Sequence, residues 1–238
     1  MSLRNFILGL SASFGLAWLL VVIVPFIKMR QLAPIPLSKE LDGVSGVFYP
    51  KRGGRIVNGA AVYGENGCYL CHTQLVRPTY AGNDLYRADW GGLAKDPERG
   101  DTRRETNAYD FEGEGFAQIG TTRMGPDLSN LTRRLEAAVA AKGSGSAEAM
   151  LYAHLYNPRR TPELRKSACP SYRYLFTRHE IKGQPSSDAL PFGGGATTEL
   201  VPSAEAKALV SYLLAMKKDQ PAPAALNFAP PDDKAASR

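Results

Sequence analysis

The chain carries no charged residue between Asn5 and Ile27, and Leu, Val, Ile, Phe and Ala dominate this stretch. A helix needs about 20 apolar residues to cross the hydrocarbon core of a bilayer, and this run is long enough. A secretory signal peptide has a shorter apolar region that ends at a small-residue cleavage site. The run here is longer, and Val24 to Ile27 offers no such site. We therefore expect residues 1–30 to form an uncleaved, single transmembrane anchor.

Beyond the anchor, the sequence divides into a linker, one domain and a tail. Prolines and a glycine pair interrupt residues 31–54, which is typical of an extended linker. With 238 residues, the chain is long enough for one good-sized domain beside the anchor and short for two. We expect this domain at residues 55–218, with a polar, acidic insertion at 79–121. The composition of residues 219–238 is typical of a disordered tail.

Three segments of the domain are predicted to be helical, which makes the protein mainly α. The first, residues 55–67, places apolar side chains at helical spacing on one face. The second runs from an N-cap at Ser146 to Tyr156, and the third from an N-cap at Ser203 to residues 217–218. The predicted core-facing residues are Ile56, Ala60, Tyr63, Ala206, Leu209, Val210 and Leu213.

The net charge of +6 is distributed unevenly along the chain. Residues 84–114 hold nine acidic and five basic residues, whereas residues 131–182 hold ten basic and four acidic residues. Such asymmetry indicates docking surfaces and contact with acidic partners. The basic residues come as scattered pairs without an aromatic platform or a nucleic-acid-binding motif, so nucleic acid is not an expected partner.

Cys68-Tyr69-Leu70-Cys71-His72 is the motif that carries the most chemical information. Cys-x-x-Cys-His is typical of covalent attachment of a c-type haem. Two thiols one helical turn apart suit thioether bonds to the vinyl groups on one porphyrin edge, and the adjacent imidazole then reaches the iron. We therefore predict one covalent haem c on Cys68 and Cys71, with His72 as the proximal iron ligand.

Other uses of a cysteine pair fit this sequence less well. A zinc site needs about four ligands in matched pairs, and the sequence has no second cysteine pair. A thioredoxin-like pair needs a surrounding βαβ pattern, but the flanking segments have a helical pattern. Three cysteines also leave Cys169 without an intrachain partner, so a disulfide framework does not explain them.

Two stretches on either side of the cysteine motif carry a further pattern: Gly59, Val62, Tyr63 and Gly67 before it, and Met124-Gly125-Pro126-Asp127-Leu128 after it. They resemble the first helix and the Gly-Pro-x-Leu loop of the class I cytochrome c fold. The resemblance implies that the Pro126 carbonyl accepts a hydrogen bond from the free imidazole nitrogen of His72, which fixes the ring and raises its basicity. It also implies that the helix at residues 203–218 crosses the first helix.

The iron needs a sixth ligand on the face opposite His72, where Met or His would be ordinary. Met124 lies beside the proximal loop and hence on the wrong face. We expect Met150 and His154 to form one more packed helix face and Met216 to pack in the core. His179 lies in a polar stretch, where a surface position is expected.

Cys169 lies where a loop should return across the open face of the haem. A lone free cysteine is often just a small buried hydrophobe. Because thiolates also ligate haem iron, we predict Cys169 as the sixth ligand, with a lower reduction potential than a His/Met site.

A longer set of motifs follows in the order found in one oxidase family. The motifs are Gly67-Cys68-Tyr69-Leu70-Cys71-His72-Thr73-Gln74-Leu75-Val76-Arg77-Pro78, Arg123-Met124-Gly125-Pro126-Asp127-Leu128, His154-Leu155 with Asn157-Pro158-Arg159, and Cys169-Pro170-Ser171-Tyr172. With the anchor, they resemble the monohaem cytochrome c subunit II (FixO or CcoO type) of cbb-type cytochrome c oxidases over most of residues 55–218. The family usually has Met where Cys169 stands, so its iron ligation does not transfer to this position. The segments 79–121 and 182–200 are not matched.

The resemblance implies an electron relay from another c-type cytochrome to the catalytic haem-copper subunit of the oxidase. It also implies the bacterial cytoplasmic (inner) membrane, with the cytochrome domain on the periplasmic side. Basic residues flanking the anchor slightly favour the opposite orientation, but that bias is a tendency counted over loops. Since a haem-copper centre needs a cluster of histidines in a helical bundle and the chain has three histidines, we do not expect this chain to reduce oxygen itself.

Three alternatives stay open at this stage. An anchored cytochrome can serve another complex, such as a nitric oxide reductase or a quinol-oxidising assembly. If Cys169 does not bind the iron, a five-coordinate haem fits a gas or redox sensor, although no output domain follows. A structural or assembly subunit with a vestigial haem is the third alternative.

Overall fold

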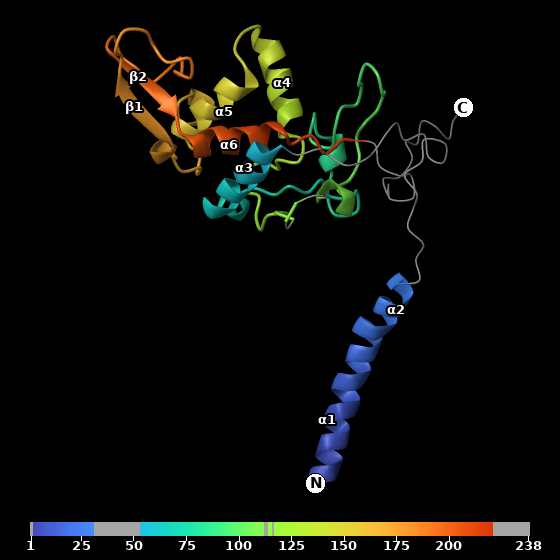
Figure 1. Ribbon diagram of the computed structural model, residues 1–238. Coiled ribbons are helices and arrows are strands. Elements are labelled where there is room, and N and C mark those ends of the chain that lie inside the picture. The colour runs from blue at the N-terminus through green and yellow to red at the C-terminus, as the bar shows by residue number, and fades with distance from the viewer. Residues whose placement is uncertain (1, 31–52, 112–113, 116, 221–238) are drawn as a thin grey trace, which may run out of the picture. The chain divides into compact units, whose positions relative to one another are not determined.

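The computed structural model in Figure 1 describes residues 2–30, 53–111, 114–115 and 117–220. Most of the predicted linker and of the predicted tail lie outside these residues. The chain divides into two compact units, residues 1–38 and 39–238, which are described separately below.

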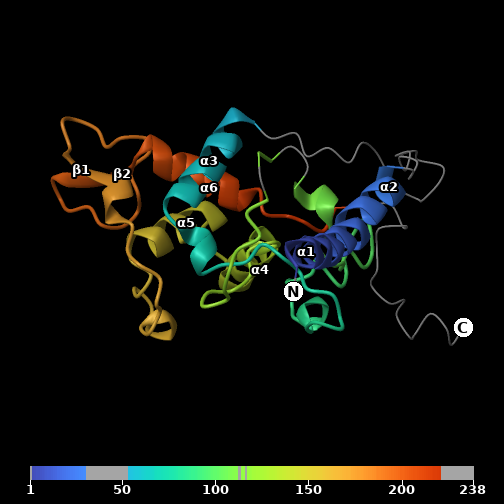
Figure 2. The same cartoon turned by 90° about the horizontal axis from the view of Figure 1, so that it is seen from below.

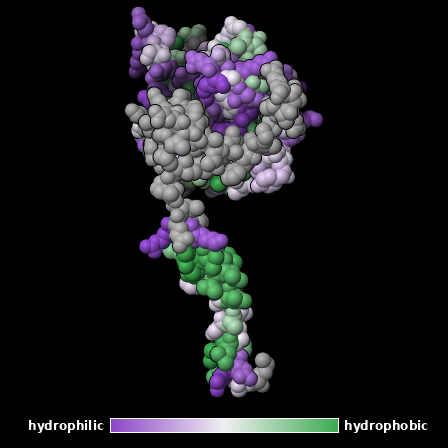
Figure 3. All heavy atoms as spheres, turned by 90° about the vertical axis from the view of Figure 1, so that its right-hand side faces the viewer, coloured by the Kyte–Doolittle hydropathy of each residue, from purple (hydrophilic) through white to green (hydrophobic). Residues whose placement is uncertain are grey.

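The described part of the first unit, residues 2–30, is one continuous apolar helix with one flanking residue. α1 (Leu3–Trp18) passes through a π-helical turn (Leu19–Ile23) into α2 (Val24–Arg30). Pro25 accounts for the wider turn, because proline has no N–H to donate to the carbonyl four residues before it. No side chain of the most apolar window in Leu3–Lys28 is buried, and Figure 3 shows hydrophobic residues over most of the helix. With 26 residues, this helix is long and apolar enough to cross a membrane, as predicted.

The described part of the second unit contains helices and one antiparallel hairpin. The helices are α3 (Gly54–Glu65), α4 (Leu131–Lys142), α5 (Ala147–Tyr156) and α6 (Ala204–Leu214). The hairpin pairs β1 (Phe176–Glu180) with β2 (Thr198–Pro202), Phe176 opposite Pro202 and Glu180 opposite Thr198. Short 3-10 turns occupy Cys68–Leu70, Asp84–Tyr86, Ala108–Phe111, Pro162–Leu164 and Arg173–Leu175.

α3 lies across α6, and this crossing organises the core (Figures 1 and 2). A Cβ atom on Gly59 would lie 2.0 Å from the backbone oxygen of Ala208, so the two helices approach as closely as a glycine allows. One turn later, the buried rings of Tyr63 and Tyr212 meet edge to face, with their centroids 5.4 Å apart. The two helices therefore cross as predicted.

The predicted caps of α5 and α6 are confirmed. The Ser146 hydroxyl accepts a hydrogen bond from the Ala149 N–H at 3.1 Å, and the Ser203 hydroxyl accepts one from the Ala206 N–H at 3.2 Å. Each bond satisfies one of the amide groups that a helix leaves unpaired at its start. All four predicted core-facing residues of α6 are buried: Ala206, Leu209, Val210 and Leu213.

Three boundaries differ from the prediction. α3 begins at Gly54, inside the predicted linker, and α6 ends at Leu214 instead of residues 217–218. Asp219, assigned to the tail, is buried and pairs with Arg133 at 3.0 Å, so it belongs to the domain. Ion pairs between residues so far apart in the chain leave no local pattern, which is why the sequence did not indicate them.

α4 and the hairpin were not predicted. In α4, Thr132 is the one fully buried residue, so the helix lacks the wide apolar stripe that periodicity detects. In β1, Phe176 is buried and the next four residues are exposed, so alternation is absent there too. The described structure nevertheless remains mostly helical.

The close approach of α3 and α6 gives a stability prediction. Gly59→Ala places a Cβ inside the backbone of α6 and should lower the free energy of unfolding by about 3 kcal/mol, the upper range for overpacking. Urea denaturation of the full chain in detergent measures this loss. Gly54→Ala in the same helix is the control, because an added Cβ there meets no atom within 4 Å. Equal stability of the two variants would contradict the proposed packing.

Candidate functional site

The Cys68–His72 motif forms a tight turn at the end of α3. Gly67 starts the turn with a φ of 65°, a left-handed conformation that favours glycine. The Cys68 carbonyl then accepts hydrogen bonds from the Cys71 N–H at 3.2 Å and the His72 N–H at 3.0 Å. These bonds hold the two cysteines one turn apart, and both thiols are free.

The His72 ring is fixed by a loop 54 residues further along the chain. Its Nδ1 lies 2.8 Å from the Pro126 carbonyl oxygen. Because a carbonyl only accepts hydrogen bonds, Nδ1 carries a proton, so Nε2 is the nitrogen whose lone pair the neutral ring can offer to a metal. A Cβ on Gly125 would lie 2.1 Å from Cε1 of His72, so the ring packs directly on the glycine backbone. The hydrogen bond implied by the sequence resemblance is present.

Asp127 joins the segment after His72 to the loop that carries Pro126. The buried Asp127 carboxylate accepts hydrogen bonds from the Thr73 hydroxyl at 2.6 Å and the Leu75 N–H at 2.7 Å. Its second oxygen accepts one from the Ser129 N–H at 2.8 Å. Multiple donors on one buried carboxylate hold both segments in a single arrangement.

Asp84 ties the insertion to the same network. Its carboxylate is fully buried between Arg77 at 3.0 Å and Arg123 at 2.8 Å. Burial by itself raises the pKa of Asp84, but hydrogen bonds from Arg123 and Arg77 outweigh burial and hold the pKa well below its usual range. Arg123 also donates from Nε to the Thr73 hydroxyl at 2.9 Å. The insertion therefore supports the backbone beside His72.

A second segment brings Cys169 to the cysteine motif. Arg159 donates to the carbonyls of Ser167 at 2.9 Å and Cys169 at 2.8 Å, which fixes the loop. Burial, and then the neighbouring Cys71, raise the pKa of the Cys169 thiol. Burial also raises the pKa of Cys68 to about 11, although a hydrogen bond with Tyr172 opposes the shift. The three thiols therefore lie in one neighbourhood.

The other candidate iron ligands differ in how exposed their side chains are. Met124 is 69% exposed, His179 is exposed on β1, and Met216 is buried in the core. Met150 and His154 are half-buried on α5. Burial, and then the charge of His72, lower the pKa of His154, so its ring lies near enough to His72 for their charges to interact.

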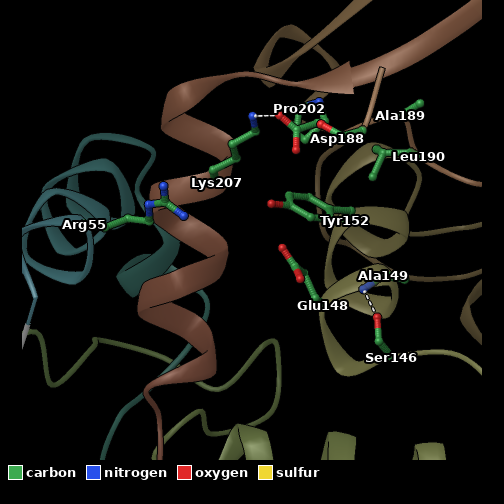
Figure 4. A pocket seen from close by; sticks show the side chains of 11 residues that line it. Arg55, Ser146, Glu148, Ala149, Tyr152, Asp188, Ala189, Leu190, Pro202 and Lys207 are labelled. Carbon is green, nitrogen blue, oxygen red and sulfur yellow. Dashed lines mark hydrogen bonds and ion pairs between the residues drawn. The ribbon is translucent and has the colours of Figure 1, made fainter. Parts of the chain in front are cut away.

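A pocket of about 280 Å³ lies away from this site, among α3, α5 and α6 (Figure 4). Its walls carry charged groups of both signs, with Arg55 and Lys207 facing Glu148 and Asp188. Lys207 pairs with Asp188 at 2.5 Å, and Tyr152 projects between them and Glu148. None of the lining residues belongs to the cysteine motif or to the Cys169 loop.

The structure brings together the five residues singled out from the sequence. Cys68, Cys71 and His72 share one turn, Pro126 contacts the His72 ring, and Cys169 lies beside the thiols. The supporting role of six further residues was not predicted, because their contacts join separate segments, although all except Asp84 lie in the motifs quoted above. They are Thr73, Asp84, Arg123, Asp127, Arg159 and Tyr172.

Comparisons with known proteins assign no family to the chain. No model of a known protein family matches it. No curated protein matches it either. The function is therefore argued from the residues and their arrangement.

The Asp84 network gives a pH-dependent prediction. Asp84→Asn leaves Arg77 and Arg123 facing a neutral amide and should lower the free energy of unfolding at pH 7 by about 3 kcal/mol. The folded pKa lies below the unfolded value of about 3.9, so this contribution is present above that value and is lost as pH falls through it toward the folded pKa. Urea denaturation at pH 7 and pH 3 should show a smaller difference in stability between the two proteins at the lower pH.

Asp101→Asn is the matched control for Asp84→Asn. Asp101 pairs with Arg103 at a half-exposed position, where an ion pair contributes roughly 0–1 kcal/mol. A similar loss of stability in both variants would show that burial between two arginines has no special effect.

Proposed function

We propose that this chain is a membrane-anchored, monohaem c-type cytochrome that relays electrons in a cbb-type respiratory oxidase. The observation that carries the proposal is the His72 ring, held through Nδ1 by Pro126 beside two free thiols one turn apart. This arrangement leaves one imidazole nitrogen for a metal and two free thiols on the same turn.

The described residues fit a covalent haem c. Cys68 and Cys71 would form the two thioethers, and His72 would bind the iron through Nε2. The Pro126 carbonyl accepts a hydrogen bond from the Nδ1 N–H of His72, which orients the ring and raises the basicity of Nε2. Gly125 provides the room for the ring, because a side chain at this position would overlap it. When bound, haem c supplies one-electron oxidation and reduction.

Cys169 is the proposed sixth ligand. Its loop is held by Arg159, and its thiol interacts with that of Cys71. Because its pKa is raised, the Cys169 thiol would have to release its proton to serve as a ligand. His154 is the competing candidate, because its half-buried ring lies near His72.

The partners and location follow from the sequence resemblance. The donor is another c-type cytochrome, and the acceptor is the catalytic haem-copper subunit. The apolar helix would anchor the chain in the bacterial cytoplasmic membrane, with the second unit on the periplasmic side, where haem is attached covalently. Purification of the complex tests this assignment, since isolation of the chain with a nitric oxide reductase or a quinol-oxidising assembly would contradict it.

Covalent haem content is the decisive test of the site. The full chain, produced with a c-type haem attachment system, should keep its colour through denaturing electrophoresis and give a c-type pyridine haemochrome spectrum. Replacing both Cys68 and Cys71 with Ala should abolish covalent haem. Cys169→Ala is the control, because it removes a thiol that forms no thioether and should keep full covalent haem. A wild-type chain without covalent haem would refute the proposal.

The sixth ligand is tested by spectroscopy and potentiometry. Cys169→Met should replace thiolate features in the absorption and magnetic spectra of the oxidised protein with those of a thioether. The reduction potential should rise by about 100 mV or more, since axial ligands set haem potentials over roughly 0.8 V. His154→Ala should leave both measurements unchanged. If His154→Ala changes the spectra and the potential while Cys169→Met changes neither, the sixth ligand is His154.

A further inference from the structure

The segment around Cys169 presents exposed, unneutralised positive charge. Five basic residues lie within residues 159–173, and one acid, Glu163, accompanies them. All five are exposed, and within the described part of the chain none of them forms an ion pair. The five are Arg159, Arg160, Arg165, Lys166 and Arg173.

Part of the negative charge of the acidic segment is paired inside the domain. Four of its aspartates, at positions 84, 96, 101 and 110, form ion pairs with arginines of the same domain. Asp84 and Asp110 are also buried. These four carboxylates are therefore matched by arginines of the same domain, whereas the five basic residues within 159–173 are not matched by acids among the described residues.

The basic segment borders the cysteine motif. Arg159 holds the Cys169 carbonyl, and the Cys169 thiol interacts with Cys71. Further along, the Tyr174 hydroxyl hydrogen bonds to the Asn66 side chain, just before the motif. Free charge at residues 159–173 thus lies beside the proposed haem attachment site.

Exposed apolar side chains lie in the motif and in the loop that contacts it. Leu70 is 52% exposed, Ile119 is 42% exposed, and Met124 is also exposed. Two hydrogen bonds join the loop to the motif and the residues after it. The Thr122 hydroxyl donates to the Leu70 carbonyl at 2.5 Å, and the Gln74 N–H donates to the Ile119 carbonyl at 2.7 Å. Apolar side chains beside charged residues are typical of a protein interface with a polar rim.

We propose that these residues form a docking face for a soluble, acidic c-type cytochrome. The docking face consists of the apolar residues Leu70, Ile119 and Met124, in or next to the cysteine motif, and the basic residues Arg165 and Lys166 in the segment that borders it. The inference rests on the proposed function, which requires a c-type electron donor. The free bases attract an acidic surface and speed its approach, and the apolar side chains bury against it on contact. The partner gives up one electron and this chain accepts it, with no bond made or broken.

Binding measured on the full chain in detergent tests the docking face. The probes are two soluble c-type cytochromes, one of net negative and one of net positive charge. At about 20 mM salt, replacing Arg165 and Lys166 with Glu should weaken binding of the acidic probe at least about tenfold. At about 500 mM salt the difference should disappear, because surface charges are then screened. Wild-type binding should favour the acidic probe.

The control carries the same charge change elsewhere. Lys95→Glu combined with Lys182→Glu alters two exposed lysines outside the docking face and should leave binding within about twofold of wild type. Ile119→Ser combined with Met124→Ser should weaken binding about equally at both salt concentrations, since apolar burial is not screened. If this serine double variant binds like wild type, the apolar side chains are not part of the docking face.

Two results separate the failure of this inference from failure of the proposed function. If the charge-reversed variant binds like the control, or the basic probe binds as tightly as the acidic one, the docking face is wrong even where covalent haem is present. If the chain carries no covalent haem, the proposed function is wrong. The binding assay needs no haem in this chain, so it still decides the docking face.

Discussion

The hydrogen bond between His72 and Pro126 is the contact on which the proposed site depends. It joins a turn at the end of α3 to a loop 54 residues later and determines which imidazole nitrogen stays available. Asp127 repeats the connection one residue further on, through Thr73 and Leu75. The turn and the loop are therefore joined by two parallel links, one through the His72 ring and one through Asp127.

Local chemistry made much of the molecule predictable. The apolar helix, the caps at Ser146 and Ser203 and the stripe on α6 follow from rules that act within a few residues. The Cys68–His72 motif is equally local. Contacts across the chain were not predictable in this way: nothing near Asp84 indicates that Arg123 will pair with it, and nothing near Asp219 indicates Arg133. The resemblance to a known loop supplied Pro126, which spacing alone did not.

The distribution of charge shows why composition alone is a weak guide to a surface. The acidic segment has the denser charge in sequence, yet Asp84 and Asp110 are buried against arginines. Arg165 and Lys166 belong to a less dense run and are exposed. A desolvated ion pair contributes to the arrangement of a fold, whereas a free surface charge acts on other molecules.

The π-helical turn before Pro25 has a consequence for neighbours in a bilayer. One added residue in a turn shifts all later side chains by roughly 100° around the helix axis. A stripe that points one way along α1 therefore points elsewhere along α2. A neighbouring helix that followed such a stripe along α1 would lose it along α2, so this apolar helix presents two differently directed faces.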